Sequence, residues 1–263
     1  MSILEFCRTN YEGVTGVVSW IGETAIDDVR FADLMGKGVA DRLFDSEGRE
    51  EFDSFIKSLP ATGFTTESIE TLFAEEVSEE RAWAVGEALA EVYVGEKYGV
   101  VWPWNTERDK RTPSASLPGA DLVGFELLAN TARLALGEVK VSSDANAPPG
   151  VMTGRSGMIN QLDNLATNLS VICQLLKWLL PRCKGTQYEE SFRSATLLFL
   201  QSGNKAISLF GVLIRDTNPN QADVVNRGHE LARHLTDPAT CNLVAIYVPC
   251  RIADLPSLAK GDA

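Results

Sequence analysis

Histidine and closely spaced cysteine are scarce in this 263-residue chain. The only two histidines, His229 and His234, would lie about 140° apart around a helix axis, too far for one metal ion. The five cysteines are odd in number, and no two have the close spacing of a zinc or redox motif. We therefore expect reduced thiols, and we do not expect catalysis by a histidine-activated Ser or Cys nucleophile.

Long apolar runs are also missing. No segment approaches eighteen uninterrupted apolar residues, and the first residues lack the basic start and apolar run of a secretion signal. We expect a cytoplasmic protein that neither spans a membrane nor is exported. With 44% hydrophobic and 23% charged residues, the composition is typical of a globular protein that can bury one large core or two modest ones.

Positive charge is scarce overall, because the net charge is −12. This balance first argues against nucleic acid, since phosphate binding relies on Lys and Arg. However, residues 1–100 contain 8 Lys and Arg against 21 Asp and Glu, whereas residues 101–263 contain 16 against 15. We therefore expect an acidic N-terminal region, 1–77, that docks a partner, and a core at 78–263. The alternative is that these acids only solvate exposed helices.

Hydrophobic periodicity predicts an α/β fold with a central mixed sheet flanked by helices. Helices are expected at Ile26–Leu34, Glu50–Leu59, Ser78–Tyr98, Met158–Leu180 and Gln221–Leu235, with Ser78 as a cap, Gly99 as a stop and Pro181 as a stop. Strands are expected at Val14–Ile21, Ala195–Gln201, Leu209–Arg215 and Leu243–Val248, and as a hairpin at Ala120–Leu128 and Arg133–Ser142. A loop at Pro103–Pro118 carries Arg108, Lys110 and Arg111.

The expected hairpin carries the residues that point to chemistry. Asp121 begins its first strand, and Glu138 and Lys140 share one face of the second, because strand side chains alternate. Asp121 and Glu138 could ligate Mg²⁺, which prefers carboxylate oxygens, with Mn²⁺ as a substitute. Lys140 could position a water molecule and offset charge on a phosphate. This set of residues is typical of phosphodiester hydrolysis.

The acid-x-Lys pattern alone carries little information. Nine lysines and 36 acids in 263 residues give about 1.2 such triplets by chance, and the chain contains one. The context matters more, because an unpaired charge inside a buried strand costs several kcal/mol. A metal bound with Asp121 would compensate that cost. The alternative is that Glu138 and Lys140 pair with each other at a sheet edge facing water.

Pro118-Gly119-Ala120-Asp121 followed by Glu138-Val139-Lys140 resembles the signature of the PD-(D/E)xK nuclease superfamily. The resemblance implies a restriction-endonuclease-like core over roughly residues 80 to 215. It also implies an acid on the preceding helix, for which Glu87 and Glu91 compete, and a glutamine on the following helix, which Gln161 matches. Gly119 and Ala120 separate Pro118 from the acid, so only Asp121 carries over. The helix residues could equally be plain solvated positions.

Chain length and the placement of Gly-Ala-Asp before Gly-Glu-Val-Lys are similar to the HamA family, the nuclease subunits of Hachiman anti-phage defence systems. This resemblance implies a largely non-specific, Mg²⁺-dependent DNA nuclease controlled by a superfamily 2 helicase of the HamB type. A different class remains open: a non-catalytic subunit that keeps a degenerate nuclease fold and binds or restrains a helicase. A site-specific restriction enzyme would need a target-reading domain, and the remaining residues offer none that is convincing.

Overall fold

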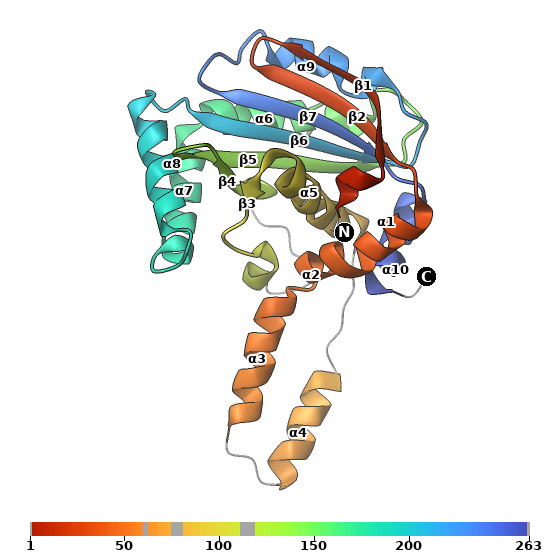
Figure 1. Cartoon of the computed structure of the whole chain (residues 1–263), viewed down its shortest axis with the longest axis vertical. Coiled ribbons are helices and arrows are strands. Elements are labelled where there is room, and N and C mark those ends of the chain that lie inside the picture. Colours follow the sequence, from red (N-terminus) through yellow and green to blue (C-terminus); the bar gives the residue numbers. More distant parts are fainter. Residues whose placement is uncertain (1, 60–62, 75–80, 111–118, 262–263) are drawn as a thin grey trace.

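Seven strands form one mixed sheet in the computed structural model, which describes residues 2–59, 63–74, 81–110 and 119–261 (Figure 1). The order across the sheet is β1-β2-β7-β6-β5-β4-β3. The four central strands β2, β7, β6 and β5 are parallel, and antiparallel pairs close both sides. The expected α/β class with a mixed sheet is therefore confirmed. The strands are β1 (Cys7–Thr15), β2 (Val18–Ala25), β3 (Val100–Val101), β4 (Leu122–Leu127), β5 (Ala132–Ser142), β6 (Ile207–Arg215) and β7 (Thr240–Tyr247).

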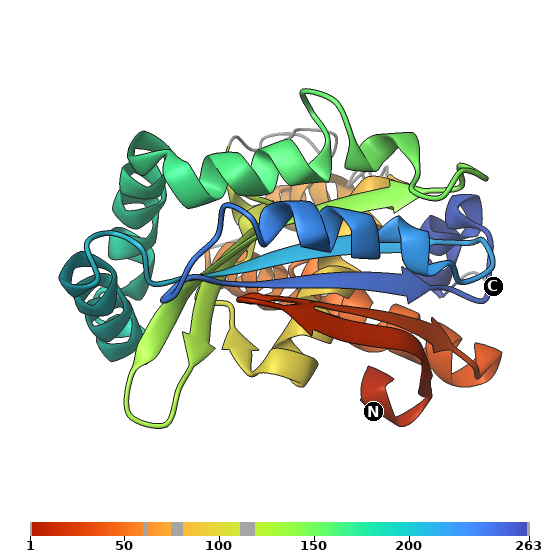
Figure 2. The ribbon, with the colours of Figure 1, turned by 90° about the horizontal axis from the view of Figure 1, so that it is seen from above.

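Helices cover both faces of the sheet, because β5, β6 and β7 are apolar on both sides. The helix α5 (Ala82–Tyr98) packs Val85, Leu89 and Tyr93 against one face, and Gly99 ends it with φ 66°. On the opposite face, α6 and α9 lie across the strands, as Figure 2 shows. The other helices are α1 (Asp28–Leu34), a π-helical turn (Met35–Val39), α2 (Ala40–Leu43), α3 (Ser46–Ser58), α4 (Gly63–Ala74), α6 (Met158–Thr167), α7 (Leu169–Cys183), α8 (Glu189–Gln201), α9 (Val225–Leu231) and α10 (Leu255–Lys260).

The acidic N-terminal region contributes both to the sheet and to a projecting arm. The strands β1 and β2 join the sheet through β7, so the sheet extends across the boundary expected at residue 77. The helices α3 and α4 project away from the sheet and its covering helices (Figure 1). No residue of α3 is buried, and Phe55 is 62% exposed. This arm therefore presents acidic and apolar side chains to its surroundings.

Most of the expected elements are present. The hairpin of β4 and β5 is confirmed, as are β6, β7, α5 and the helices near Ile26–Leu34 and Glu50–Leu59. The cap predicted at Ser78 lies outside the described residues. Gln221–Leu235 is only partly helical, because a 3₁₀ turn at Gln221–Asp223 precedes a shorter α9.

Three predicted elements are wrong. The strand predicted at Val14–Ile21 is two strands, because the chain reverses at Gly16 with φ 58°. The helix predicted at Met158–Leu180 breaks at Asn168, whose extended backbone lets its side chain accept the N–H groups of Ser170 and Val171 and cap α7. Pro181 lies inside α7 and does not stop it. Ala195–Gln201 belongs to α8, where Ala195 and Phe199 are buried four residues apart.

Candidate active site

Asp121, at the start of the hairpin, lies beside Glu138 of β5. Asp121 lies directly before β4, and its N–H donates to the carbonyl oxygen of Gly137 on β5 at 3.0 Å. The N–H of Val139 in turn donates to Oδ2 of Asp121 at 2.8 Å. These two bonds hold the Asp121 carboxylate beside the centre of β5, where Glu138 is only 2% exposed.

Glu138 and Lys140 share the face of β5 that also carries Leu134 and Leu136, as the alternation predicted. The Lys140 ammonium lies 3.4 Å from Oε2 of Glu138. The predicted alternative of a water-facing sheet edge is wrong, because β5 pairs with β4 on one side and β6 on the other. The two residues therefore pair inside the sheet, beside Asp121.

The pKa of Glu138 indicates that its carboxyl group and that of Asp121 lie close together. Burial, followed by the charge and hydrogen bonding of Asp121, raises the pKa of Glu138 to about 8 against the opposing effect of Lys140. A carboxyl with this pKa holds a proton at neutral pH. A cation bound between the two carboxyl groups would lower the pKa of Glu138, because a nearby positive charge favours the ionised form.

Glu87, on α5, lies near the Asp121 carboxylate. Gly86 permits this approach, because a Cβ at that position would lie 2.3 Å from the Val141 side chain on β5. Burial and then the Asp121 carboxylate raise the pKa of Glu87 to about 8, while Lys110, 3.9 Å away, opposes the shift. Glu87 and Asp121 also line the same cavity.

Glu91, the competing helix acid, points elsewhere. It is 7% exposed, and its Oε2 accepts a hydrogen bond from Nε of Arg42 on α2 at 2.5 Å. Burial raises the pKa of Glu91, and the Arg42 guanidinium counteracts this. Glu91 therefore ties α5 to α2, and only Glu87 of the two shares a cavity with Asp121.

Gln161 lies on α6, partly buried, and its Oε1 has no hydrogen-bond partner among the described residues. It is not among the described residues that line the cavity beside Asp121, whereas Asn164, one turn later, is. The structure thus brings Asn164 to this cavity instead of Gln161.

The two described cations of the loop before the hairpin, Arg108 and Lys110, contact different parts of the molecule. Arg108 contacts the start of α3, because its guanidinium pairs with Asp45 at 2.7 Å and Glu47 at 2.8 Å. The Lys110 side chain is 4% exposed and pairs with Glu107 and Glu87. Arg111 lies outside the described residues. Lys110 is therefore the described loop cation that reaches the candidate site.

The donor atoms suit a hard divalent cation. Across residues 2–59, 63–74, 81–110 and 119–261, no group of three or more His, Cys, Asp or Glu is gathered to hold a metal ion. Asp121 and Glu138 instead offer a pair of carboxylates. Mg²⁺ is commonly held by one or two carboxylates, with waters and substrate phosphate oxygens completing its coordination. This pair of donors fits that pattern.

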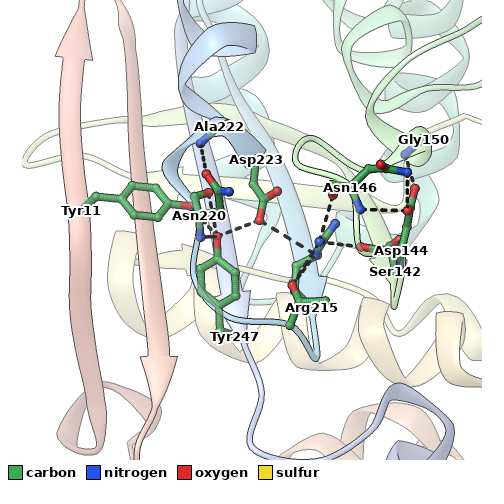
Figure 3. Close-up of polar contacts among 11 residues, drawn as sticks. Tyr11, Ser142, Asp144, Asn146, Gly150, Arg215, Asn220, Ala222, Asp223 and Tyr247 are labelled. Atoms are coloured by element: carbon green, nitrogen blue, oxygen red, sulfur yellow. Dashed lines mark hydrogen bonds and ion pairs between the residues drawn. The ribbon is translucent and has the colours of Figure 1, made fainter.

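A second polar cluster, which sequence reasoning missed, lies at the carboxyl ends of the parallel strands (Figure 3). Arg215 ends β6, is 1% exposed, and donates from Nη2 to the carbonyl oxygens of Asp144 and Asn146 in the loop after β5. Its Nε lies 3.9 Å from Oδ2 of Asp223, which also accepts the Tyr247 hydroxyl at 2.8 Å. The cluster fixes the loop that follows the strand bearing Glu138.

Two atoms of this cluster are buried without a partner among the described residues, Nη1 of Arg215 and Oδ1 of Asp223. Burial raises the pKa of Asp223, and the Tyr247 hydroxyl and Arg215 counteract this. A charged residue at the end of an otherwise apolar strand is the one sequence signal that could have indicated Arg215. Its partner Asp223 follows eight residues later.

No helix among the described residues is both long and apolar enough to cross a membrane.

Comparison with known proteins gives no family for this chain. No protein-family model matches it, and no curated protein sequence matches it.

Proposed function

We propose that this protein is a metal-dependent DNA nuclease with a PD-(D/E)xK-type centre in a restriction-endonuclease-like core. The observation that carries the proposal is the contact between Asp121 and the β5 backbone, which sets two carboxyl groups side by side with Lys140 on the same face. The raised pKa of Glu138 supports it, because neighbouring carboxyl groups with shifted pKa values are typical of functional sites.

Each residue has a distinct role in this proposal. Asp121 and Glu138 would hold Mg²⁺, or Mn²⁺ in its place, and Glu87 would reach the same centre from α5. A bound divalent cation supplies Lewis-acid polarisation of the phosphate and lowers the pKa of water. Lys140 orients the attacking water and offsets the negative charge that grows on the phosphate oxygens. A role for Gln161 on α6 stays a prediction from the resemblance, because its Oε1 has no partner among the described residues and its side chain does not line the cavity beside Asp121.

The partner in this proposal is a superfamily 2 helicase, with which the chain would degrade DNA without sequence preference in anti-phage defence. The charge distribution supports a partner-controlled enzyme. Residues 46–80 contain ten Asp and Glu against two Lys and Arg, and this segment includes the α3–α4 arm. An acidic arm repels DNA and complements a basic protein surface. Exposed Phe55 on α3 and exposed Leu59, directly after this helix, would add apolar contact area.

The second candidate is a non-catalytic subunit that keeps a degenerate nuclease fold and restrains the helicase. One observation favours it: the Lys140 ammonium lies 3.4 Å from the Glu138 carboxyl group, and this contact could serve the stability of the sheet alone. The two candidates differ in metal binding and in cleavage.

The test is incubation of the purified chain with linear and plasmid DNA in Mg²⁺ and in EDTA, with and without a superfamily 2 helicase. We expect Mg²⁺-dependent cleavage that is lost in the double variant Glu138→Ala, Lys140→Ala. Equal cleavage by parent and double variant would refute the assigned residues. Absence of cleavage under every condition would favour the non-catalytic subunit.

A further inference from the structure

A cavity of about 640 Å³ lies beside the candidate centre, and Glu87 and Asp121 are among the residues that line it. This volume lies within the range of about 300–1,000 Å³ that small-molecule sites occupy. A ligand in the cavity would contact the same carboxylates that we assign to the nuclease centre. The shape and lining of the cavity therefore indicate which form of nucleic acid the centre binds.

Aromatic and apolar side chains form much of the wall. Trp83 comes from α5 and Trp178 from α7, and Val123 and Leu175 add aliphatic surface. Two amide side chains, Asn164 and Gln174, also line the cavity and are exposed to solvent. A flat aromatic ligand with hydrogen-bonding edges matches these walls, because ring faces stack on tryptophan and amides pair with polar edges.

The tryptophans are held in place before any ligand arrives. Nε1 of Trp178 donates to Asp109 at 2.8 Å, and Arg182, over the Trp178 ring at 4.3 Å, donates to the other Asp109 oxygen at 2.7 Å. Lys110 lies 4.9 Å from the centre of the Trp83 ring. Such fixed rings bind a flat ligand with little loss of side-chain entropy.

We infer that this cavity receives an unpaired nucleobase of the strand being cut, so that the substrate class is single-stranded or frayed nucleic acid. A base inside a duplex is stacked and paired and cannot reach such a cavity unless it is flipped out. Stacking on tryptophan is tolerant of sequence, because every base has a flat face. This inference rests on the proposed nuclease function, and it gives a helicase a role as the source of unpaired strand.

The experiment measures binding of a fluorescein-labelled ten-residue oligothymidylate, and of a duplex of equal length, to the full chain in EDTA at low salt. We expect the single strand to bind more tightly than the duplex. Trp83→Ala and Gln174→Ala should each weaken single-strand binding, the former at least about fivefold, since one stacked base contributes about 1–3 kcal/mol. Trp83→Phe should restore most of the affinity. Leu180→Ala, on the exposed side of α7, serves as the matched control and should bind as the parent does.

Equal or tighter binding of the duplex would overturn the inference. Unchanged single-strand affinity in both Trp83→Ala and Gln174→Ala, with parental circular dichroism, would overturn it as well. Binding in EDTA needs no cleavage, so the two proposals fail separately. Selective binding without any Mg²⁺-dependent cleavage would refute the nuclease and leave the cavity assignment standing. Cleavage of single and double strands at equal rates would refute the cavity assignment and leave the nuclease proposal standing.

Discussion

Val139 donates its backbone N–H to Oδ2 of Asp121 at 2.8 Å, so the residue between Glu138 and Lys140 holds the carboxylate that precedes β4. The bond crosses between neighbouring strands, and it fixes Asp121 relative to both charged side chains of β5. A carboxylate anchored by a backbone N–H needs no rearrangement to receive a cation.

The stability of the metal-free protein should fall as pH rises. Glu138 has a pKa of about 8 in the folded chain and an ordinary value near 4.5 when unfolded, so the folded state binds its proton more tightly. Its contribution is complete below pH 4.5 and is lost as pH rises through 8. We expect the free energy of unfolding in EDTA to decrease by a few kcal/mol between pH 5 and pH 8, since each pK unit corresponds to about 1.4 kcal/mol.

The matched variant for this prediction is Glu138→Gln, which cannot ionise and should show a flatter pH profile in urea denaturation. Added Mg²⁺ should raise the stability of the parent at pH 8 more than at pH 5, because the cation competes with the proton. The prediction fails if parent and variant have parallel profiles.

Lys140→Met should reduce DNA cleavage by about 10²-fold or more, because it removes the charge that offsets the reacting phosphate. Metal binding should persist, since both carboxylates remain. Lys140 lowers the pKa of Glu138, so its loss favours the protonated acid, and binding is best compared at pH 9. Lys205→Met, at an exposed position before β6, is the control that should cleave normally. Parental cleavage by Lys140→Met would remove the lysine from the mechanism.

Arg215→Met should destabilise the protein by about 3–5 kcal/mol, because it leaves Asp223 as an uncompensated buried charge. It also removes the bonds to the carbonyl oxygens of Asp144 and Asn146. Thermal unfolding is the measurement. Arg251→Met, at a side chain that is 80% exposed, should change stability by no more than about 0.5 kcal/mol. Similar melting temperatures for the two variants would show that the cluster of Figure 3 is not structural.

The isolated chain should bind duplex DNA weakly and with strong dependence on salt, because its net charge is −12 and the arm is acidic. Fluorescence anisotropy at 50 and 200 mM salt measures this. Glu50→Lys together with Glu67→Lys, both at exposed positions of the arm, should raise DNA affinity and weaken association with a helicase partner. Tight, salt-insensitive binding by the parent would contradict the proposed control by a partner.

The sequence predicted the centre of the fold better than its periphery. The hairpin of β4 and β5, the helix α5 and the strands β6 and β7 follow from strong apolar patterns with clear stops such as Gly99. These elements carry Glu87, Asp121, Glu138 and Lys140, so the candidate site could be assembled from strand alternation and order along the chain.

Other elements depended on tertiary contacts that a periodicity cannot reveal. The apolar run at Ala195–Gln201 is compatible with a strand or a helix. The helix forms because it buries Ala195 and Phe199, four residues apart, on one face. The break at Asn168 arises from one side-chain cap inside a continuous helical pattern. The cavity walls come from α5, α7 and the loop near Lys110, and no local spacing indicates that Trp83 and Trp178 line the same cavity.

Isothermal titration calorimetry with Mg²⁺ and Mn²⁺ at pH 8 tests most directly whether Asp121 and Glu138 form a metal centre. We expect saturable binding by the parent, and its loss in Asp121→Asn, which has a similar shape but no negative charge. Asp109→Asn is a matched control, because Asp109 lines the same cavity while paired with Arg182. Binding that is absent in the parent, or equal in the parent and Asp121→Asn, would contradict the account.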